Sequence, residues 1–375
     1  MKILHIYSGN LFGGVETFLV TLAKCQNLCP DMHQSFALCY EDRLSKELKT
    51  ETKNVFILGE TRISRPWTIW LVRKRLCGLL KKEKFDLAVC HGCWAQFVFG
   101  SAVKKSNVPL VLWVHDVLKG TDWLEVLARS IVPDFVIANS KYTQKAIAKF
   151  YQEVPNDFVY YPVISPDLKE RESARKKIRA ELGISQEAVI ISLVSRLEKW
   201  KGHELLISSL AKIKDKAEWC CCIVGGPQRP KESKYLKSLQ QKASQLGIER
   251  RVRFLGERRD VFPILFASDI FCQPNMTPEP FGVSFIEAMH AKLPIVTTDI
   301  ESGAKEIIDN NCSKLVPPND VSSLSLALDF LLSNSTQRVT FGECGFKRAL
   351  SLCDPTVQLY KIYNIFSKVI GNYDK

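Results

Sequence analysis

The 375-residue chain alternates short apolar runs with longer amphipathic stretches. In its first half the candidate strands are KILHIYS, FALCY, NVFIL, LAVCH, LVLWVHD and FVIANS, several of them continuous and rich in β-branched residues. Runs of this kind are typical of strands that are covered on both faces of a parallel sheet. Their alternation with helical stretches predicts a doubly wound α/β fold.

A second series begins after residues 159–168, where Pro162 and Pro166 interrupt a short apolar segment. It contains the strand candidates VIISLVSR, WCCCIVGG, RVRFLG, DIFCQP and PIVTT, with helices expected over 203–214, 231–246 and 283–292. A chain of this length is expected to form two hydrophobic cores. The sequence therefore predicts an N-terminal domain over 1–163, a second domain over 164–354, and a C-terminal helix over 355–375 that crosses back to the first domain.

Composition narrows the class of protein. No stretch approaches the roughly 18 apolar residues needed to cross a bilayer, and the N-terminus turns polar after Ile6, too early for a signal-peptide core. We therefore expect a cytoplasmic protein. The thirteen cysteines are irregularly spaced, which favours buried free thiols over a disulfide framework. Cys90 and Cys93 enclose His91, which fits neither haem attachment nor a zinc half-site, so no metal site is predicted.

Basic residues are concentrated in one segment. The formal net charge is +12, and residues 62–84 contain eight Lys and Arg against Glu83 alone. Apolar side chains recur there at roughly helical spacing, among them Trp67, Trp70 and Leu71. A basic amphipathic helix fits an anionic membrane surface, and the alternative is a solvated helix packed on its own domain. No stacking platform or recognition motif indicates a nucleic-acid partner.

The stretch EPFGVSFIE places the carboxylates Glu279 and Glu287 around a loop that enters a helix. Glu279 precedes Pro280 and is biased toward an extended backbone, Gly282 permits close approach to a ligand, and helical spacing begins at Val283. The stretch could be an acid/base pair, a clamp for a sugar, or an ordinary helix entry. The local spacing does not favour a glycosidase pair, so the clamp is the better interpretation. Free N–H groups at the helix start also suit hydroxyls or developing negative charge.

Two cations are expected at the same edge of the second sheet. Arg196 ends the strand VIISLVS and Lys201 follows at the entrance to the next helix, so both can reach the strand edge where such sheets bind ligands. An Arg fork and a Lys point charge together suit a diphosphate leaving group. In the first domain, Gly13 and Gly14 precede a helix and offer a weaker anion site, and His115 ends the strand LVLWVHD. We expect these edges to share one cleft.

The ordered set of motifs resembles family-four glycosyltransferases, also called group 1, which are retaining enzymes of the GT-B fold that use nucleotide sugars. The similar segments span nearly the whole chain and include GGVETFLVTLA, LVLWVHD, VIANSKYTQKAI, VSRLEKWKGHELLISSL, IVGGP, RVRFLG and EPFGVSFIEAMHAKLPIVTTD. Glu279 and Glu287 stand in the family's E-x7-E positions, and Arg196 with Lys201 in its basic pair. The resemblance implies two Rossmann-like, doubly wound domains that face a central cleft.

The resemblance also implies a role for each candidate residue. Arg196 and Lys201 would neutralise the diphosphate. Glu279 would bind the donor-sugar hydroxyls, and His115 would lie beside the sugar near the reacting carbon. Glu287 would hold the nucleotide ribose. Further donor contacts would come from Gly13, Gly14, Gly225, Gly256, Glu257, Arg258, Phe281, Gly282 and Val283.

The implied reaction is retaining transfer of a hexose-type sugar from a UDP- or GDP-sugar to a hydroxyl of a glycan or lipid-linked acceptor. A diphosphate oxygen would accept the proton of that hydroxyl, so no separate base is required. Asp-x-Asp does not occur in the sequence, and we expect the two cations to replace a metal, with no cofactor. Two alternatives stay open: a GT-B nucleotide-sugar epimerase, for which no carboxylates around C2 are found, and a non-catalytic nucleotide-sugar-binding subunit.

The resemblance is weaker in the loop 301–307, where Ser302 and Gly303 replace a common Gly-Gly pair and Glu306 keeps its place. Acceptor contacts would come from the first domain, where similarity is lowest. Because the basic segment 62–84 belongs to that domain, we expect a membrane-anchored glycan or lipid acceptor in cell-envelope synthesis, and possible peripheral contact with the inner membrane face.

Overall fold

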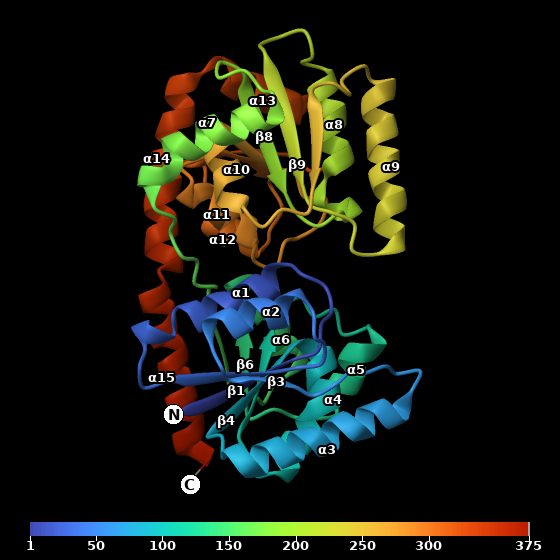
Figure 1. The fold of residues 1–375 in the computed structure, drawn as a ribbon, viewed down its shortest axis with the longest axis vertical. Coiled ribbons are helices and arrows are strands. Elements are labelled where there is room, and N and C mark those ends of the chain that lie inside the picture. The colour runs from blue at the N-terminus through green and yellow to red at the C-terminus, as the bar shows by residue number, and fades with distance from the viewer. Residues whose placement is uncertain (374–375) are drawn as a thin grey trace. The chain divides into compact units, whose positions relative to one another are not determined.

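A computed structural model describes residues 1–373, and Figure 1 shows its fold. The chain divides into two compact units. Unit 1 consists of Met1–Ile164 together with the chain from Cys353, and unit 2 consists of Ser165–Leu352. Residues 374 and 375, at the end of the helix expected over 355–375, lie outside the described residues.

Within the described residues, unit 1 contains a seven-stranded parallel sheet with the order β3-β2-β1-β4-β5-β6-β7. Its strands are β1 (Lys2–Tyr7), β2 (His33–Leu38), β3 (Val55–Ile57), β4 (Leu87–His91), β5 (Leu110–Val114), β6 (Phe135–Ala138) and β7 (Asn156–Phe158). Its helices are α1 (Gly14–Lys24), α2 (Arg43–Glu51), α3 (Pro66–Glu83), α4 (Gly92–Lys105), α5 (Trp123–Arg129), α6 (Lys141–Phe150) and α15 (Pro355–Tyr373).

The sequence pattern explains this unit. The apolar runs of β4 and β5 are buried along their whole length, because α1 and α2 cover one face of the sheet and α3 and α4 the other (Figure 1). Local chemistry sets the helix starts. The Ser140 hydroxyl accepts from the Thr143 N–H at the start of α6, and Pro66 occupies the first turn of α3.

Unit 2 contains a six-stranded parallel sheet, again within the described residues, with the order β10-β9-β8-β11-β12-β13. Its strands are β8 (Val189–Val194), β9 (Trp219–Val224), β10 (Val252–Gly256), β11 (Ile270–Gln273), β12 (Ile295–Thr298) and β13 (Ser313–Val316). Its helices are α7 (Arg171–Leu182), α8 (His203–Ala211), α9 (Pro230–Gln245), α10 (Val261–Ala267), α11 (Val283–His290), α12 (Gly303–Ile307), α13 (Val321–Ser333) and α14 (Ser335–Cys353).

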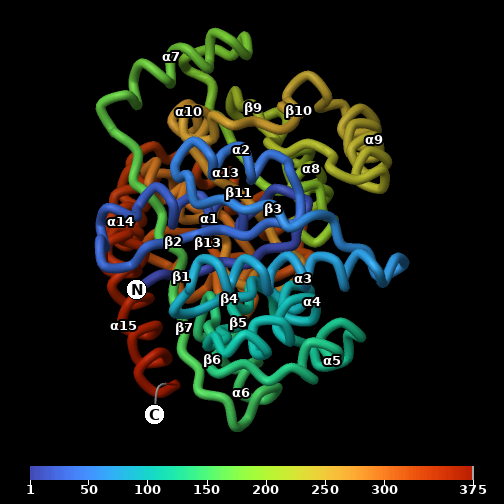
Figure 2. The backbone as a smooth tube through the Cα atoms, turned by 60° about the horizontal axis from the view of Figure 1, so that its bottom comes forward, coloured from blue at the N-terminus to red at the C-terminus, as the bar shows by residue number. Residues whose placement is uncertain are grey.

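Helix α15 belongs to unit 1. The Val163 N–H donates to the Cys353 carbonyl at 3.1 Å, just before this helix begins. The Phe366 ring of α15 lies 6.4 Å from the His5 ring of β1, measured between centres. Figures 1 and 2 both show α15 beside the N-terminal strand. The last helix therefore completes the packing of the first sheet.

The described residues include all thirteen cysteines, and each is a free thiol, as their irregular spacing predicts. Cys90 is buried and Cys93 is partly buried. Among residues 1–373, no group of three or more His, Cys, Asp or Glu could hold a metal ion. No helix in this range combines the length and apolar character that a bilayer crossing requires.

Candidate functional site

An ion pair between Lys201 and Glu279 lies at the carboxyl edge of the unit 2 sheet. Lys201 ends a 3-10 turn that follows β8, and Glu279 lies in the loop between β11 and α11. Lys201 Nζ lies 2.5 Å from Glu279 Oε2, and the two side chains are only 12% and 9% exposed. Lys201 Nζ also lies 4.0 Å from the centre of the Trp200 ring. A charge-assisted hydrogen bond that is screened so little by water fixes both side chains.

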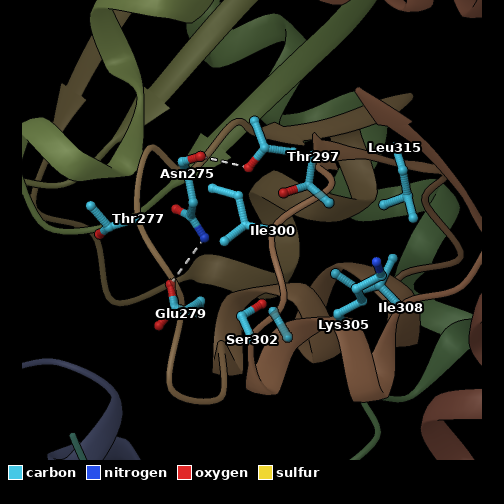
Figure 3. A pocket seen from close by; sticks show the side chains of 11 residues that line it. Asn275, Thr277, Glu279, Thr297, Ile300, Ser302, Lys305, Ile308 and Leu315 are labelled. Carbon is cyan, nitrogen blue, oxygen red and sulfur yellow. Dashed lines mark hydrogen bonds between the residues drawn. The ribbon is translucent and has the colours of Figure 1, made fainter. Parts of the chain in front are cut away.

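Two amide side chains bind the same carboxylate oxygen. Gln273 Nε2 and Asn275 Nδ2 each lie 3.3 Å from Glu279 Oε2, and Figure 3 shows Asn275 directed at Glu279. Gln273 Oε1 accepts from the Ser284 hydroxyl at 3.1 Å, which links this network to the first turn of α11. No described protein group donates to Glu279 Oε1. One oxygen of this fixed carboxylate is therefore available to a ligand.

The loop from Glu279 into α11 depends on a glycine. Gly282 has a φ of +93°, and a Cβ added there would lie 2.6 Å from Phe285 Cδ2, so another side chain would be strained. Phe281 is buried, and Val283 begins the helix. Glu287 lies about one turn further on, and removal from water raises its pKa to about 7. The second carboxylate of the motif is therefore partly protonated near neutral pH.

Arg196 is in the same loop as Lys201 but has a different partner. The Arg196 guanidinium lies 3.1 Å from Glu198, and Trp200 Nε1 donates to this carboxylate at 3.0 Å. The Arg196 side chain is 35% exposed, far more than that of Lys201. Each of the two predicted cations thus pairs with its own carboxylate. The Arg196–Glu198 pair is accessible, and the Lys201–Glu279 pair is enclosed.

A pocket opens beside Glu279, formed by the loops that follow β11 and β12 together with α12 (Figure 3). It is lined by Asn275, Thr277, Glu279, Thr297, Thr298, Ile300, Ser302, Ala304, Lys305, Ile308 and Leu315. Lys305 forms an ion pair with Asp299 at 2.5 Å. Three residues of the weakly matching loop 301–307, Ser302, Ala304 and Lys305, therefore line the same pocket as the clamp carboxylate.

The end of β10 and the loops that follow β9 and β10 contain four further predicted donor-binding residues. Gly225 has a φ of +143°, and a Cβ there would lie 1.9 Å from the Ser195 carbonyl oxygen, so this loop packs directly on the one that contains Arg196. The Gly225 N–H donates to the Gly256 carbonyl at 2.8 Å, and Glu257 follows Gly256 at the end of β10.

Arg258 is the fourth of these residues, and two carboxylates bind it. Its Nη2 lies 2.7 Å from Asp260, and its Nη1 lies 2.7 Å from Glu181. These hydrogen bonds raise the pKa of Arg258 above its usual value. The guanidinium is therefore held by its own unit, in an orientation set by acidic neighbours.

In unit 1, Gly13 and Gly14 form the start of α1. Gly13 precedes the helix, and Gly14 is its first residue. The Gly13 N–H donates to Glu16 Oε2 at 2.8 Å, and the Tyr7 hydroxyl donates to the other oxygen of Glu16. A carboxylate of the protein therefore binds one of the N–H groups at the anion site that the sequence predicts.

His115 follows β5 at the carboxyl edge of the unit 1 sheet and is buried. Its Nε2 lies 2.9 Å from His91 Nδ1, and its Nδ1 is hydrogen-bonded to the Tyr161 hydroxyl. Its backbone carbonyl accepts from Asn139 Nδ2 at 2.9 Å. Burial lowers the pKa of His115 to about 3, so the ring is neutral.

Sequence patterns predict the charged residues of these edges but miss the neutral residues that hold them. His91 is visible only as a polar residue that ends the run LAVCH, and Gln273 only as one that ends DIFCQ. Asn275 and Tyr161 have no comparable signal. Their importance depends on which strands and loops the fold brings together.

Two family models match the chain. Residues 174–348 match Glycosyl transferases group 1, and residues 12–162 match Glycosyltransferase Family 4. A D-inositol 3-phosphate glycosyltransferase from Corynebacterium aurimucosum is 27% identical over 61% of this chain and 56% of its own length. The chain spans about half the length of the curated relatives it matches first.

Solved structures are similar over almost the full length. The structure of Anabaena HepE in complex with UDP-glucose has a TM-score of 0.85 at 24% identity, and the match covers 98% of this chain and 100% of HepE. A glycosyltransferase from Rickettsia africae has a TM-score of 0.85 at 21% identity and is matched over 99% of both chains. The fold class predicted from the sequence, two Rossmann-like units of the GT-B type, is confirmed.

Proposed function

The chain belongs to the group 1 glycosyl transferases of family 4, and we propose that it transfers a hexose from a nucleotide-diphosphate sugar to an acceptor hydroxyl with retention of configuration. The proposal rests mainly on the enclosed Lys201–Glu279 pair, because a fixed cation and a fixed carboxylate at one strand edge suit the two halves of such a donor. Lys201 attracts the diphosphate, and Glu279 accepts from the sugar hydroxyls through its available Oε1.

The remaining residues of unit 2 support the same donor. Arg196 provides a second, more accessible cation for the diphosphate. Backbone N–H groups of Phe281 to Val283, at the start of α11, suit the sugar hydroxyls, and Glu287 suits the ribose diol. We assign Gly225, Gly256, Glu257 and Arg258 to the nucleotide, and Gly13, Gly14 and His115 of unit 1 to the reacting end of the donor, as the family resemblance implies.

In the reaction, the bond between the sugar C1 and the diphosphate oxygen breaks, and a bond from C1 to the acceptor oxygen forms on the same face of the sugar. The proton of the acceptor hydroxyl goes to the departing diphosphate. Positive charge develops on the sugar and negative charge on the phosphate, so preorganised cations stabilise the transition state more than the bound substrate. Lys201 and Arg196 are sufficient for this, and we propose that neither a metal nor a cofactor is needed.

Nucleotide release tests this function. The protein would be incubated with UDP-glucose and, separately, with other UDP- and GDP-hexoses, with and without a lipid-linked glycan acceptor. Wild-type protein should release free nucleotide in an acceptor-dependent manner, and Glu279→Gln should lower the rate by at least about 100-fold. An epimerised sugar without release would support an epimerase instead, and donor binding without either product would support a non-catalytic subunit.

A membrane-associated acceptor is supported by the surface of α3. Trp67 and Trp70 are 64% and 63% exposed, and Lys74 is also exposed on this helix. By contrast, Leu76 and Leu80 of the same predicted stripe are buried in the unit 1 core. The first half of α3 thus presents aromatic and basic side chains that suit an anionic lipid surface, where we propose that the enzyme meets its acceptor on the cytoplasmic side.

Vesicle binding tests this contact. Two arginines of the segment are unsuitable probes, because Arg73 Nε donates to the Val98 carbonyl at 2.6 Å and Arg75 Nη1 to the Leu58 carbonyl at 2.7 Å. The double variant Trp67→Ser with Trp70→Ser should weaken binding to phosphatidylglycerol vesicles. The control Leu326→Ser removes an equally exposed apolar side chain, 68% exposed in unit 2, and should leave binding unchanged. Equal losses in both variants would contradict a specific surface on α3.

A further inference from the structure

Three histidines form a diagonal across one face of the unit 1 sheet. His5 lies on β1, His91 ends β4, and His115 follows β5. The strand register pairs His5 with Val89 and His91 with Trp113, so each successive histidine lies two residues further toward the carboxyl edge. Because side chains alternate along a strand, all three imidazoles lie on the same face.

Hydrogen bonds join these imidazoles ring to ring. His5 Nδ1 lies 2.9 Å from His91 Nε2, and His91 Nδ1 lies 2.9 Å from His115 Nε2. His115 Nδ1 is hydrogen-bonded to the Tyr161 hydroxyl. All four side chains are buried, so contacts within the protein replace those that water would make.

The rings of this chain are neutral. Phe36 stacks on His5 with 5.4 Å between ring centres, and Trp113 stacks on His91 with 5.8 Å. Burial lowers the pKa of His5 and of His115 to about 3, and that of His91 well below its usual value. A neutral imidazole has one N–H and one acceptor nitrogen, so every link must point the same way along the chain.

Gln34 on β2 sets that direction. Its Nε2 donates to the Leu22 carbonyl at 3.2 Å, which fixes the orientation of the amide. Gln34 Oε1 and His5 Nε2 are both buried, and neither forms a hydrogen bond with any described residue. The strand register pairs Gln34 with Ile3, two residues before His5, so Gln34 continues the histidine diagonal onto β2 and lies close enough to oppose the fall in the pKa of His5. An amide oxygen can only accept, so pairing of these two unsatisfied atoms requires that His5 is protonated at Nε2 and accepts at Nδ1.

The same direction holds at each following link. His91 donates from Nε2 to His5 and accepts at Nδ1, and His115 donates from Nε2 to His91. His115 Nδ1 is therefore an acceptor, and the Tyr161 hydroxyl donates to it. The tautomer of His115 is thus determined by an amide at the opposite end of the chain.

We propose that Gln34, His5 and His91 are positioning residues that hold His115 as a hydrogen-bond acceptor and so select a hydroxyl on the donor sugar. The inference rests on the proposed function, which assigns His115 to the reacting end of the donor. A sugar hydroxyl can replace the Tyr161 hydroxyl as the donor to His115 Nδ1. The carboxylate of a hexuronic acid has no proton to donate, and its negative charge would face the lone pair of His115 Nδ1. We therefore expect the enzyme to use neutral hexoses in preference to hexuronic acids linked to the same nucleotide.

Nitrogen-15 NMR of the histidine rings tests the direction of the chain in the full-length protein. The sequence has only six histidines, so selective labelling gives a simple spectrum. At pH 7, His5, His91 and His115 should each be protonated at Nε2 alone. Gln34→Leu removes the terminal acceptor and should convert a measurable fraction of His115 to the form protonated at Nδ1.

Gln96 provides a matched control for this variant. It is buried in the same unit, donates through Nε2 to the Ile131 carbonyl at 2.7 Å, and has a buried Oε1 without a partner, so none of its hydrogen bonds goes to the histidines. Gln96→Leu should leave the His115 resonances unchanged. A wild-type His115 protonated at Nδ1, or a His115 tautomer that Gln34→Leu leaves unaltered, would overturn the proposal.

Transfer from UDP-glucose and UDP-glucuronic acid tests the selection of the sugar. Wild-type kcat/KM should favour UDP-glucose, and Gln34→Leu should narrow that preference about three- to tenfold, whereas Gln96→Leu should not. An unchanged preference together with an altered His115 tautomer would contradict selection by this ring. If the wild type releases no nucleotide from any donor, the proposed function fails, while the NMR measurement still decides the direction of the hydrogen-bond chain.

Discussion

When the strands of each unit are numbered along the chain, both sheets have the order 3-2-1-4-5-6, and unit 1 adds a seventh strand. The ends of equivalent strands nevertheless carry different chemistry in the two units. In unit 1 the register pairs His5 of β1 with Val89 of β4, and in unit 2 it pairs Ser192 of β8 with Phe271 of β11. In both units the partner strand ends two residues further on, at His91 of β4 and at Gln273 of β11.

This difference separates a network that meets the donor through a neutral ring from one that meets it through a charged carboxylate. In unit 1, His91 bonds only to other neutral rings, and the chain passes from strand to strand. In unit 2, Gln273 donates to Glu279, which is also bound by Lys201 and keeps one oxygen available. The same position at a strand end thus supports tautomer control in one unit and carboxylate placement in the other.

The largest effect is expected at Lys201. Lys201→Ala removes the enclosed cation and leaves Glu279 without its charge partner, so the rate of sugar transfer should fall by about 100- to 1,000-fold. Lys199, an exposed lysine of the same turn, supplies the control, and Lys199→Ala should transfer at nearly the wild-type rate. Similar losses in the two variants would mean that general positive charge matters and not the Lys201–Glu279 geometry.

A smaller loss of activity is expected at Gln273. Gln273→Leu removes one of the two amides that bind Glu279 Oε2 and also leaves the Ser284 hydroxyl without its acceptor. The carboxylate should lose part of its orientation, and kcat should fall about tenfold. Steady-state kinetics with UDP-glucose would measure this. If Gln273→Leu kept the wild-type kcat, Lys201 and Asn275 would be sufficient to hold Glu279. The comparison of Gln273 with His91 would then have no consequence for activity.

The sequence predicts those features that depend on neighbours along the chain. Continuous apolar runs predict β4 and β5 because both faces of these strands are covered. The helix expected over 283–292 ends at His290, since Lys292 adopts a left-handed backbone with a φ of +57°. The sequence also predicts that Lys201 and Glu279 lie at the same carboxyl edge, because one follows a strand and the other lies in a loop of the same sheet, but it does not predict that they form an ion pair.

Features that depend on register between distant strands were not predicted. The histidine diagonal exists only because β1, β4 and β5 are neighbours and each histidine is shifted by two residues. For the same reason the segment 62–84 indicates a charged surface but not that Arg73 and Arg75 bind backbone carbonyls of their own unit. A long basic side chain has the same appearance in the sequence whether its charge faces solvent or a carbonyl.

Acid should destabilise unit 1 more steeply than unit 2. Each buried histidine has a folded pKa far below its usual 6.5, so the unfolded state binds a proton that the folded state does not. Stability is therefore lost as the pH falls below about 6.5, at about 1.4 kcal/mol per pH unit for each ring. Unit 1 contains three such rings and unit 2 contains two, His203 and His290, whose pKa values are lowered to about 4.

Hydrogen exchange at pH 7 and pH 5.5 would measure this difference, because it resolves opening in each unit separately. Amides of β4 and β5 should lose more protection than those of β8 and β11. Replacement of the exposed His33 by Asn should leave the difference unchanged. Equal losses in the two units would contradict the view that neutral imidazoles dominate the acid response of unit 1.

The last prediction concerns Glu287, whose effect on stability has the opposite sign to that of the histidines. Its folded pKa of about 7 lies above the usual 4.5, so its contribution to stability is complete below pH 4.5 and is lost as the pH rises through 7. Glu287→Gln removes the cost of burying this charge. The free energy of unfolding without nucleotide should rise by about 2 kcal/mol at pH 8 and hardly change at pH 4.5. Urea denaturation at the two pH values would measure the change.

The same variant should bind UDP less tightly at pH 8, because the ribose diol loses a charged acceptor. A variant that is more stable and binds UDP as well as the wild type would place the ribose elsewhere in unit 2.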